Sequence, residues 1–277
     1  MKRSEIVLKA FLNRCPPKKR KALERFLPPE EREHLARLPE ISAPASAADF
    51  SQEEILEGVH WSWFIPTLKS YSEREQRLFL AALSPGVAEQ LGQTLSLGGT
   101  LEKVSSCARD YLRGQLLHSL AGHRLLPIDF LPPSPLNRLL SLSKKKLMQL
   151  IDRLSLYDLA AEMRQIVETK ILKKIYSFLS EEQRKALKQL PPPKEAHSIP
   201  RLGLDRWDGE EESLRVLLHR RGLTRLGLVL SGQDPDLIWM ICHRLDIGRG
   251  GSLFKLCAQE TTPAMTEMVL KQIEEQL

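Results

Sequence analysis

The best candidate for a phosphate-binding loop in the sequence is Gly248-Arg249-Gly250-Gly251-Ser252. Backbone N–H groups at the start of a helix can hold such an anion. The segment lacks the Gly-Lys-Ser/Thr ending of a P-loop, and no predicted strand precedes it. We therefore interpret it as the end of one helix followed by the start of the next, and whether it binds an anion stays open.

Metal ligation needs converging histidine, cysteine or carboxylate side chains, and Cys242-His243 with Cys257 is the only local grouping. Adjacent residues on a helix point about 100° apart, so Cys242 and His243 cannot easily reach one ion. The acidic cluster at residues 205–212 lies where a helix begins, and acids there complement the helix dipole. No Gly-x-Ser-x-Gly segment occurs. These patterns predict no metal, no cofactor and no enzyme activity.

Three basic runs could contact an acidic partner or a nucleic acid: Lys18–Lys21, Lys144–Lys146, and His219–Arg221 with Arg225. Only the first has an aromatic residue nearby, Phe26, which we place in the core of a turn. Lys144–Lys146 follow Ser143, a predicted N-cap, and the helix dipole disfavours cations there. That cost indicates that something outside the helix uses the charge. A solvated face without a ligand is the alternative.

Residues 60–64, His-Trp-Ser-Trp-Phe, form the richest aromatic stretch. Trp61 and Trp63 lie about 200° apart on a helix, so they cannot both face one core stripe. Either one of them anchors a partner, as tryptophan often does at interfaces, or the helix is buried on both sides. Together with the basic runs, this stretch gives the predicted partner-binding residues: Trp61, Trp63, Lys144, Lys145, Lys146, Arg220 and Arg221.

The elements that position these residues are indicated by the kind of apolar residue in the chain. Its 277 residues include 50 Leu against 14 Ile and 8 Val, and only 6% are aromatic. Strands favour β-branched and aromatic side chains, whereas Leu loses little rotamer freedom in a helix. Apolar residues recur every three or four positions, as at Leu147, Leu150, Ile151 and Leu154. The sequence therefore predicts an all-α fold of stacked short helices.

Helix starts are predicted where a capping residue precedes proline, at Ser84-Pro85, Ser134-Pro135, Asp234-Pro235 and Thr262-Pro263. Capping boxes are predicted at Ser51…Glu54, Ser72…Glu75, Ser180…Gln183 and, with aspartate as the cap, Asp208…Glu211. Short turns between these starts predict helix–turn–helix units.

Two stretches rich in Pro, Ala and Ser divide the chain, at residues 39–48 and 191–200. They predict a basic N-terminal helical segment at 1–40, a middle helical-repeat body at 50–190 and a C-terminal helical module at 205–277. Residues 1–40 hold 11 Lys/Arg and 6 Asp/Glu, a net charge of +5, in a chain whose total is +6. Such asymmetry indicates a nucleic acid, an acidic partner or a membrane surface, or else a solvated face.

Residues 26–39 (FLPPEEREHLARLP) and 178–191 (FLSEEQRKALKQLP) are identical at seven of 14 positions. The matched pairs include Phe26/Phe178, Leu27/Leu179, Arg32/Arg184 and Leu35/Leu187. Looser copies occur at residues 82–95 and 230–245, where chance similarity between leucine-rich helices is an equal alternative. Repeated helix–turn–helix units cannot bury their apolar faces alone, so they stack on one another.

The turn pattern Phe-Leu-(Ser/Pro)-x-Glu followed by Leu-x-x-Leu resembles the middle domain of the flagellar switch protein FliG and the N-terminal domain of magnesium transporters. The matching stretches are Phe26–Glu31, Leu83–Val87 and Phe178–Gln183. The sequence is thereby similar to FliG-like or SctK-like all-helical adaptors of type III secretion or flagellar-type machinery. The resemblance implies a helical superhelix that docks to a ring or sorting platform. The Glu-His-Pro-Gln signature of FliG is absent, so motor function does not follow.

We expect a non-enzymatic cytoplasmic adaptor, at the cytoplasmic face of a membrane complex, whose partners are other proteins of a secretion or motor machine. A helical nucleic-acid-binding module that uses the basic patches is the alternative. Four cysteines are too few for a disulfide-stapled domain, which favours a reducing compartment. Charged residues and prolines interrupt residues 116–136, the most apolar stretch, so no membrane span is predicted.

Overall fold

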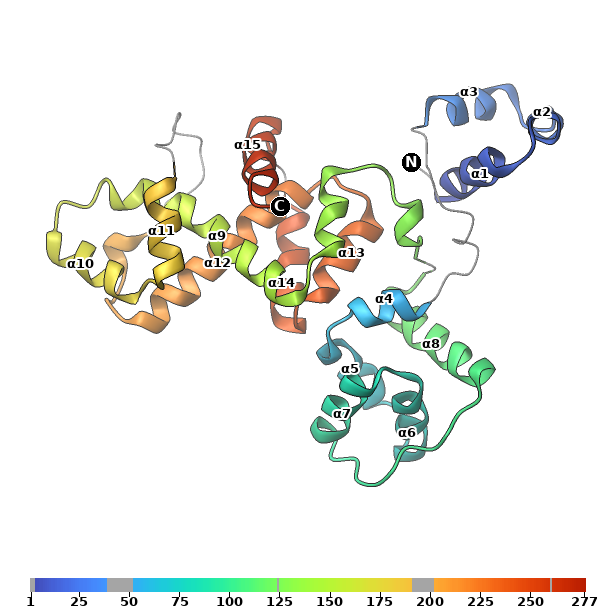
Figure 1. The fold of residues 1–277 in the computed structure, drawn as a ribbon, viewed down its shortest axis with the longest axis horizontal. Coiled ribbons are helices and arrows are strands. Elements are labelled where there is room, and N and C mark those ends of the chain that lie inside the picture. Colours follow the sequence, from blue (N-terminus) through green and yellow to red (C-terminus); the bar gives the residue numbers. More distant parts are fainter. Residues whose placement is uncertain (1–2, 39–51, 124, 191–201, 260) are drawn as a thin grey trace. The chain divides into compact units, whose positions relative to one another are not determined.

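The structure, a computed structural model, describes residues 3–38, 52–123, 125–190, 202–259 and 261–277. The regular elements in these residues are helices, and no strand occurs among them (Figure 1). The all-α fold of short stacked helices predicted from the leucine content is confirmed. The predicted linkers at 39–48 and 191–200, and the predicted cap Ser51, lie outside the described residues.

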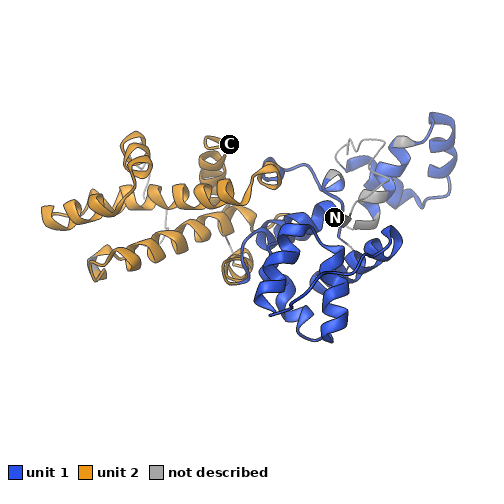
Figure 2. Ribbon diagram, turned by 60° about the horizontal axis from the view of Figure 1, so that its bottom comes forward, with its two compact units in different colours: residues 1–137, 234–247 blue, residues 138–233, 248–277 orange. Residues whose placement is uncertain are grey.

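The chain packs into two compact units, and each unit combines segments that are distant in the sequence (Figure 2). Unit 1 comprises Met1–Asn137 and Asp234–Ile247, and unit 2 comprises Arg138–Gln233 and Gly248–Leu277. The α13 helix therefore belongs to unit 1, although the helix before it belongs to unit 2 and the helix after it lies almost wholly there. Each unit is described here by itself.

Unit 1 is built from short helices. They are α1 (Arg3–Arg14), α2 (Pro17–Glu24), α3 (Pro29–Arg37), α4 (Gln52–Gly58), α5 (Phe64–Leu68), α6 (Glu73–Ala82), α7 (Pro85–Thr94), α8 (Ser106–Ala121) and α13 (Pro235–Arg244), with 3₁₀ turns η2 (Trp61–Trp63) and η3 (Ile128–Phe130). Asp236 at the start of α13 is fully buried and accepts a hydrogen bond from the Leu126 backbone N–H at 2.8 Å and one from His123 Nε2 at 3.1 Å. These bonds attach α13 to the segment that follows α8.

Unit 2 contains two long helices, α9 (Lys144–Met163) and α12 (Glu211–Leu230), which pack against each other. The others are α10 (Thr169–Phe178), α11 (Glu181–Gln189), α14 (Ile247–Cys257) and α15 (Pro263–Glu274), with a 3₁₀ turn η5 (Leu204–Arg206). Gly222 lies where α12 meets α9, and a Cβ atom there would lie 2.0 Å from the Ile151 carbonyl oxygen. Only glycine permits this approach of the two backbones.

Most predicted helix starts are confirmed. The α7, α13 and α15 helices begin at Pro85, Pro235 and Pro263, each directly after its predicted cap. Complete capping boxes form at Ser72–Glu75 and Ser180–Gln183. Pro135 begins a 3₁₀ helix, η4 (Pro135–Ser141), instead of an α-helix. Because such helix starts recur along the leucine-rich chain, most of its helices are short.

One predicted capping box is wrong, because α12 begins two residues later than the Asp208 cap requires. Its N-cap is Glu210, whose side chain makes no capping bond. The Asp208 carboxylate instead accepts hydrogen bonds from the Glu210 backbone N–H at 2.9 Å and from the Ser213 hydroxyl, and the latter is the main reason that the Asp208 pKa lies below its usual value. Glu211 and Glu212 occupy the first turn, where they complement the helix dipole as predicted.

The two strong copies of the repeat form the same turn. Arg32 Nη2 donates to the Leu27 carbonyl oxygen at 3.1 Å, and Arg184 Nε donates to the Leu179 carbonyl oxygen at 3.0 Å. Leu35 and Leu187 are each 7% exposed. In both copies, an arginine of the second helix thus satisfies a carbonyl group left open in the turn between the helices.

The copies differ at their matched phenylalanines. Phe178 is partly buried and packs edge-on against Trp207, with ring centroids 6.2 Å apart. Phe26 is 87% exposed. The prediction that Phe26 lies in the core of its turn is therefore wrong, and the small core of α1–α3 is made by Leu12, Leu35 and Leu38.

Candidate functional site

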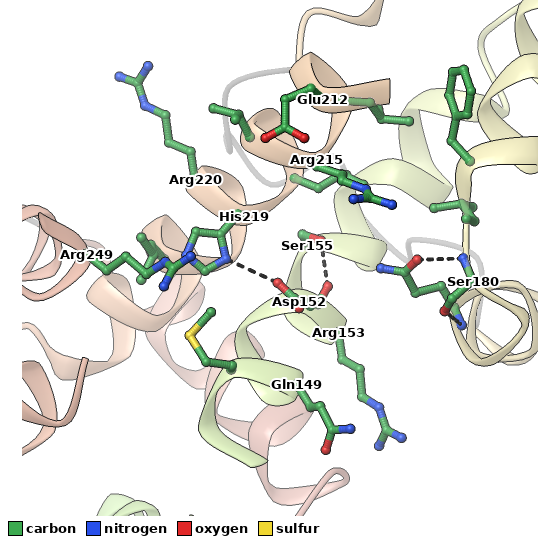
Figure 3. Close-up of a pocket in the computed structure, with 18 of the residues that line it drawn as sticks. Gln149, Asp152, Arg153, Ser155, Ser180, Glu212, Arg215, His219, Arg220 and Arg249 are labelled. Carbon is green, nitrogen blue, oxygen red and sulfur yellow. Dashed lines mark hydrogen bonds and ion pairs between the residues drawn. The ribbon is translucent and has the colours of Figure 1, made fainter. Parts of the chain in front are cut away.

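A groove in unit 2 runs between α9, the turn that joins α10 to α11, α12 and α14 (Figure 3). Its volume is about 1060 Å³. Apolar side chains such as Phe178, Leu218 and Val216 contribute to its lining, and Val216 is 60% exposed. The charged lining residues are Arg153, Arg215, Arg220, Arg249 and Lys255 against Asp152, Glu182 and Glu212. Apolar surface with an excess of arginine and lysine suits a partner that is apolar and acidic.

Ser155, His219 and Asp152 line this groove and are the residue types of a hydrolase triad. Asp152 Oδ1 lies 3.2 Å from His219 Nδ1, as an orienting carboxylate would. The Ser155 hydroxyl, however, donates to the Asp152 backbone carbonyl at 2.6 Å, as the dashed lines in Figure 3 show, and Ser155 is 1% exposed. His219 Nε2 is buried without a hydrogen-bond partner. The serine is not bonded to the histidine that would activate it, so these three residues do not form a triad.

Of the two arginines predicted to bind a partner, Arg220 lies at the groove and is exposed. Its neighbour Arg221 points elsewhere, because its Nε lies 3.6 Å from Asp158 and only 11% of its side chain is exposed. Burial lowers the Arg221 pKa, and the charge of Asp158 opposes that effect. Arg225, which follows one helical turn later, is 4% exposed and also pairs with Asp158. Within this run, His219 and Arg220 therefore line the groove, whereas Arg221, like the nearby Arg225, lies inside unit 2.

The run Lys144–Lys146 directly follows the N-cap of a helix, as predicted. Ser143 caps α9, and its Oγ accepts the Lys146 backbone N–H at 3.3 Å. Lys144, Lys145 and Lys146 form the exposed first turn of α9. Three cations at a helix N-terminus oppose the helix dipole, so they weaken the helix locally.

The two tryptophans have different surroundings in unit 1. Both are partly buried in η2. Trp63 Nε1 donates to the Leu245 carbonyl at 2.8 Å, and its ring stacks on His243, with centroids 4.1 Å apart. Trp61 instead faces the ring of His60, with centroids 5.3 Å apart. Trp63 therefore joins η2 to the end of α13, and Trp61 has the weaker attachment.

His243 lies between two indole rings. Besides Trp63, the ring of Trp239 stacks on the imidazole, with ring centroids 3.8 Å apart and planes 20° apart. His243 Nδ1 lies 2.8 Å from the Trp239 carbonyl oxygen, and the residue is 3% exposed. Burial lowers the His243 pKa to about 4. The imidazole is therefore neutral at pH 7, as part of an aromatic stack.

The glycine-rich segment forms no loop. Gly248–Ser252 lie inside α14, and the break between helices falls earlier, after α13 ends at Arg244. Interpreting the segment as the end of one helix and the start of another was therefore wrong. Within the described residues, no group of three His, Cys, Asp or Glu side chains is placed to hold a metal ion. Cys242 is buried in the core of unit 1.

A second groove, in unit 1, has a volume of about 1090 Å³ and lies between α4, α6, α7, α8 and residues 96–104. Arg113 of α8 is one of its lining residues. This arginine is 8% exposed, donates to the Ala82 carbonyl at 2.7 Å and pairs with Glu53 at 2.6 Å. Both of its bonds hold helices together, so we assign Arg113 a structural role.

Several important residues were missed by sequence reasoning. The Glu162 carboxylate accepts three successive backbone N–H groups, from Leu202, Gly203 and Leu204, at 2.5, 3.0 and 2.8 Å. It thereby fixes the segment that precedes α12. Asp158 and Gly222 were also missed. A glycine inside a leucine-rich helix was the available signal for Gly222, because glycine weakens a helix unless close packing requires it.

No protein-family model, no curated protein and no solved structure matches this chain. Among the residues that the structure describes, none of the helices combines the length and the apolarity needed to cross a bilayer.

Proposed function

We propose that the protein is a non-enzymatic adaptor that binds other proteins, and that it docks in the cytoplasm to a ring or sorting platform of a type III secretion or flagellar-type machine. The observation that carries this proposal is the matched pair of turns. Two of the three stretches on which the resemblance to FliG-like and SctK-like adaptors rests, Phe26–Glu31 and Phe178–Gln183, lie in helix–turn–helix units with the same arginine-to-carbonyl bond.

The groove of unit 2 is the docking surface that we propose for the partner. It lies beside one of the two matched turns, since Phe178, Leu179 and Ser180 line it. Val216 offers an exposed apolar contact, and Arg220 and Lys255 offer positive charge. Exposed apolar contacts together with charged residues are a common composition of a protein-binding surface.

Site-specific photocrosslinking in cells of the source organism tests this proposal. A photoreactive phenylalanine replaces Val216 in the groove and, as the control, Val167, which is 93% exposed and does not line the groove. We expect a crosslinked product from position 216, and not from position 167, whose partner is a component of a secretion or flagellar-type machine. Equal crosslinking from both positions, or a partner from neither kind of machine, would refute the proposal.

Nucleic-acid binding remains the alternative, and the exposed Lys144–Lys146 turn favours it most, because the helix dipole gives these lysines no local benefit. Gel retardation with mixed DNA and RNA at low salt distinguishes the two functions. A shift that is lost when the three lysines are changed to alanine supports the alternative, and no shift excludes it.

A further inference from the structure

The N-terminal basic segment carries a helix whose described side chains are all outside the core. The α2 helix is the short helix between α1 and α3 (Figure 1). None of its eight residues is buried. Leu23 is 40% exposed, and Phe26, just after the helix, is 87% exposed. Lys18, Lys19, Lys21 and Arg25 are also exposed. The surface of α2 and the turn after it thus combines exposed cations with two exposed apolar side chains.

The charges on α2 are divided between two sides of the helix. Arg20 pairs with Glu24 at 2.7 Å and donates to Asn13 of α1 at 3.2 Å, so this side of α2 is directed toward α1. Lys19, Leu23 and Phe26 follow one another at spacings of four and three residues, and so share another side. The backbone continues to turn beyond Glu24, because the Phe26 N–H bonds to the Leu23 carbonyl at 3.1 Å.

Lys18, Lys21 and Arg25 lie further around the helix, since residues two apart, such as Lys21 and Leu23, point about 200° apart. Together with Lys19, Leu23 and Phe26 they make up the exposed surface that we name the basic face. It contains four cations and two apolar side chains and no carboxylate. The sequence has no Asp or Glu anywhere from residue 6 to residue 23. The carboxylate that follows, Glu24, is already paired with Arg20. Within the described residues, the basic face therefore presents positive charge beside the exposed apolar side chains Leu23 and Phe26.

The internal repeat shows what the same face does elsewhere in the chain. With Phe26 matched to Phe178, Lys19 corresponds to Ile171 and Leu23 to Ile175. In the second copy this face is part of a core, because Ile175 is fully buried, and Ile171 and Phe178 pack against that core. The first copy keeps the apolar residues Leu23 and Phe26 but has lysine in place of Ile171. A lysine at this position is unsuited to an apolar protein core.

We propose that the basic face binds the surface of an anionic lipid membrane. Phe26 and Leu23 enter the region between headgroups and acyl chains, while the lysines and Arg25 contact lipid phosphates. This combination of a short basic helix with exposed aromatic and aliphatic residues is the pattern of proteins that lie on a membrane without crossing it. The inference goes beyond the adaptor function and does not rest on it.

Cosedimentation of the full chain with lipid vesicles tests the proposal. We expect binding to vesicles of equal parts phosphatidylglycerol and phosphatidylcholine, and little binding to pure phosphatidylcholine. Binding must weaken at high salt, where the screening length falls to roughly 3 Å. Equal binding to both kinds of vesicle, or binding to neither, would overturn the proposal. A protein that retards an oligonucleotide in a gel but does not bind the vesicles would overturn it as well.

The repeat supplies a matched control. Lys18 and Lys21 correspond to Lys170 and Lys173, which are also exposed. The double variant Lys18→Glu/Lys21→Glu is expected to lower vesicle binding at least tenfold, whereas Lys170→Glu/Lys173→Glu, with the same change in net charge, leaves it nearly unchanged. If both double variants lose binding equally, net charge alone is responsible and the basic face is not the site.

Phe26→Ser provides an independent test of the apolar contact. Because Phe26 is 87% exposed, the variant is expected to keep the unfolding transition of the wild type. Its binding to anionic vesicles should fall several-fold at every salt concentration. Unchanged binding would show that the contact is electrostatic only and would refute the insertion of Phe26.

Discussion

Arg225 and Asp158 form a two-point ion pair inside unit 2, with Nε 2.8 Å from Oδ2 and Nη2 2.6 Å from Oδ1. Arg225 also donates to Gln272 of α15 and lies over the ring of Tyr157, with its guanidinium carbon 5.5 Å from the ring centroid. One arginine of α12 thereby joins α9 and α15. Since a buried charge is tolerated only when it is paired, the stability of unit 2 depends on this contact.

Asp158→Ala leaves the Arg225 charge buried without its main partner. We expect the free energy of unfolding to fall by about 3–5 kcal/mol. Urea titration followed by circular dichroism measures the change. The control is Glu267→Ala, which removes the exposed pair with Lys271 and should cost less than about 1 kcal/mol. Similar losses in the two variants would contradict the importance given to the buried pair.

Gly222→Ala places a methyl group on the Ile151 carbonyl oxygen, so the backbones of α9 and α12 must separate. We expect a loss of about 3 kcal/mol or more. The matched control is Gly251→Ala in α14, where a Cβ atom meets nothing within 4 Å. There the higher helix propensity of alanine should stabilise the protein by about 0.5–1 kcal/mol. The same thermal or urea measurement checks both, and a stable Gly222→Ala variant would disprove the contact.

The His243 stack predicts that acid weakens unit 1. The folded pKa of about 4 is below the ordinary value of 6.5, so the unfolded chain binds a proton more readily between these two pH values. The free energy of unfolding is therefore expected to fall as the pH drops from 6.5 toward 4, by about 3 kcal/mol in all, and the contribution then levels off. Urea titrations across this range measure it.

His243→Phe separates this effect from the titration of other groups. Phenylalanine can occupy the space between Trp63 and Trp239 but takes up no proton. The pH dependence of unfolding should become shallower between pH 6.5 and 4 than in the wild type. Identical slopes in the two proteins would show that His243 does not contribute.

The repeated turns predict a shared role for two arginines. Arg184→Ala and Arg32→Ala each remove a hydrogen bond to a turn carbonyl, which is worth about 1 kcal/mol. The loss should be greater for Arg184, because Leu179 is 3% exposed whereas the Arg32 bond lies at the surface. Urea unfolding of both single variants, with Lys185→Ala as an exposed control, tests this order.

Much of the fold could be predicted because its signals are local. Leucine content indicated helices, and caps such as Ser72, Ser180 and Asp234 fixed where they begin. A cap acts on backbone groups two or three residues away, so a single sequence contains both partners. The matched turns were predictable for the same reason, since Arg32 and Arg184 each bond to a carbonyl five residues earlier.

The candidate site could not be predicted in this way, because its residues meet only after folding. Asp152 and His219 are 67 residues apart in sequence, as are Asp158 and Arg225. In the sequence, Arg220 and Arg221 are adjacent members of the same basic run and have the same predicted role. The structure places Arg220 at the groove and Arg221 against Asp158. The side of a helix that is buried depends on which other helix packs against it. Composition and spacing do not identify that helix.

The placement of α13 in unit 1 has a consequence for synthesis of the chain. Asp236, which bonds to Leu126, and His243, which stacks on Trp63, are made about a hundred residues or more after their partners. A ribosome completes unit 1 only after it has also made most of unit 2. During synthesis, the core of unit 1 therefore lacks the contacts of α13 until residues 234–247 have been made. The gene accordingly cannot be divided at any single codon into two fragments that each encode a whole unit.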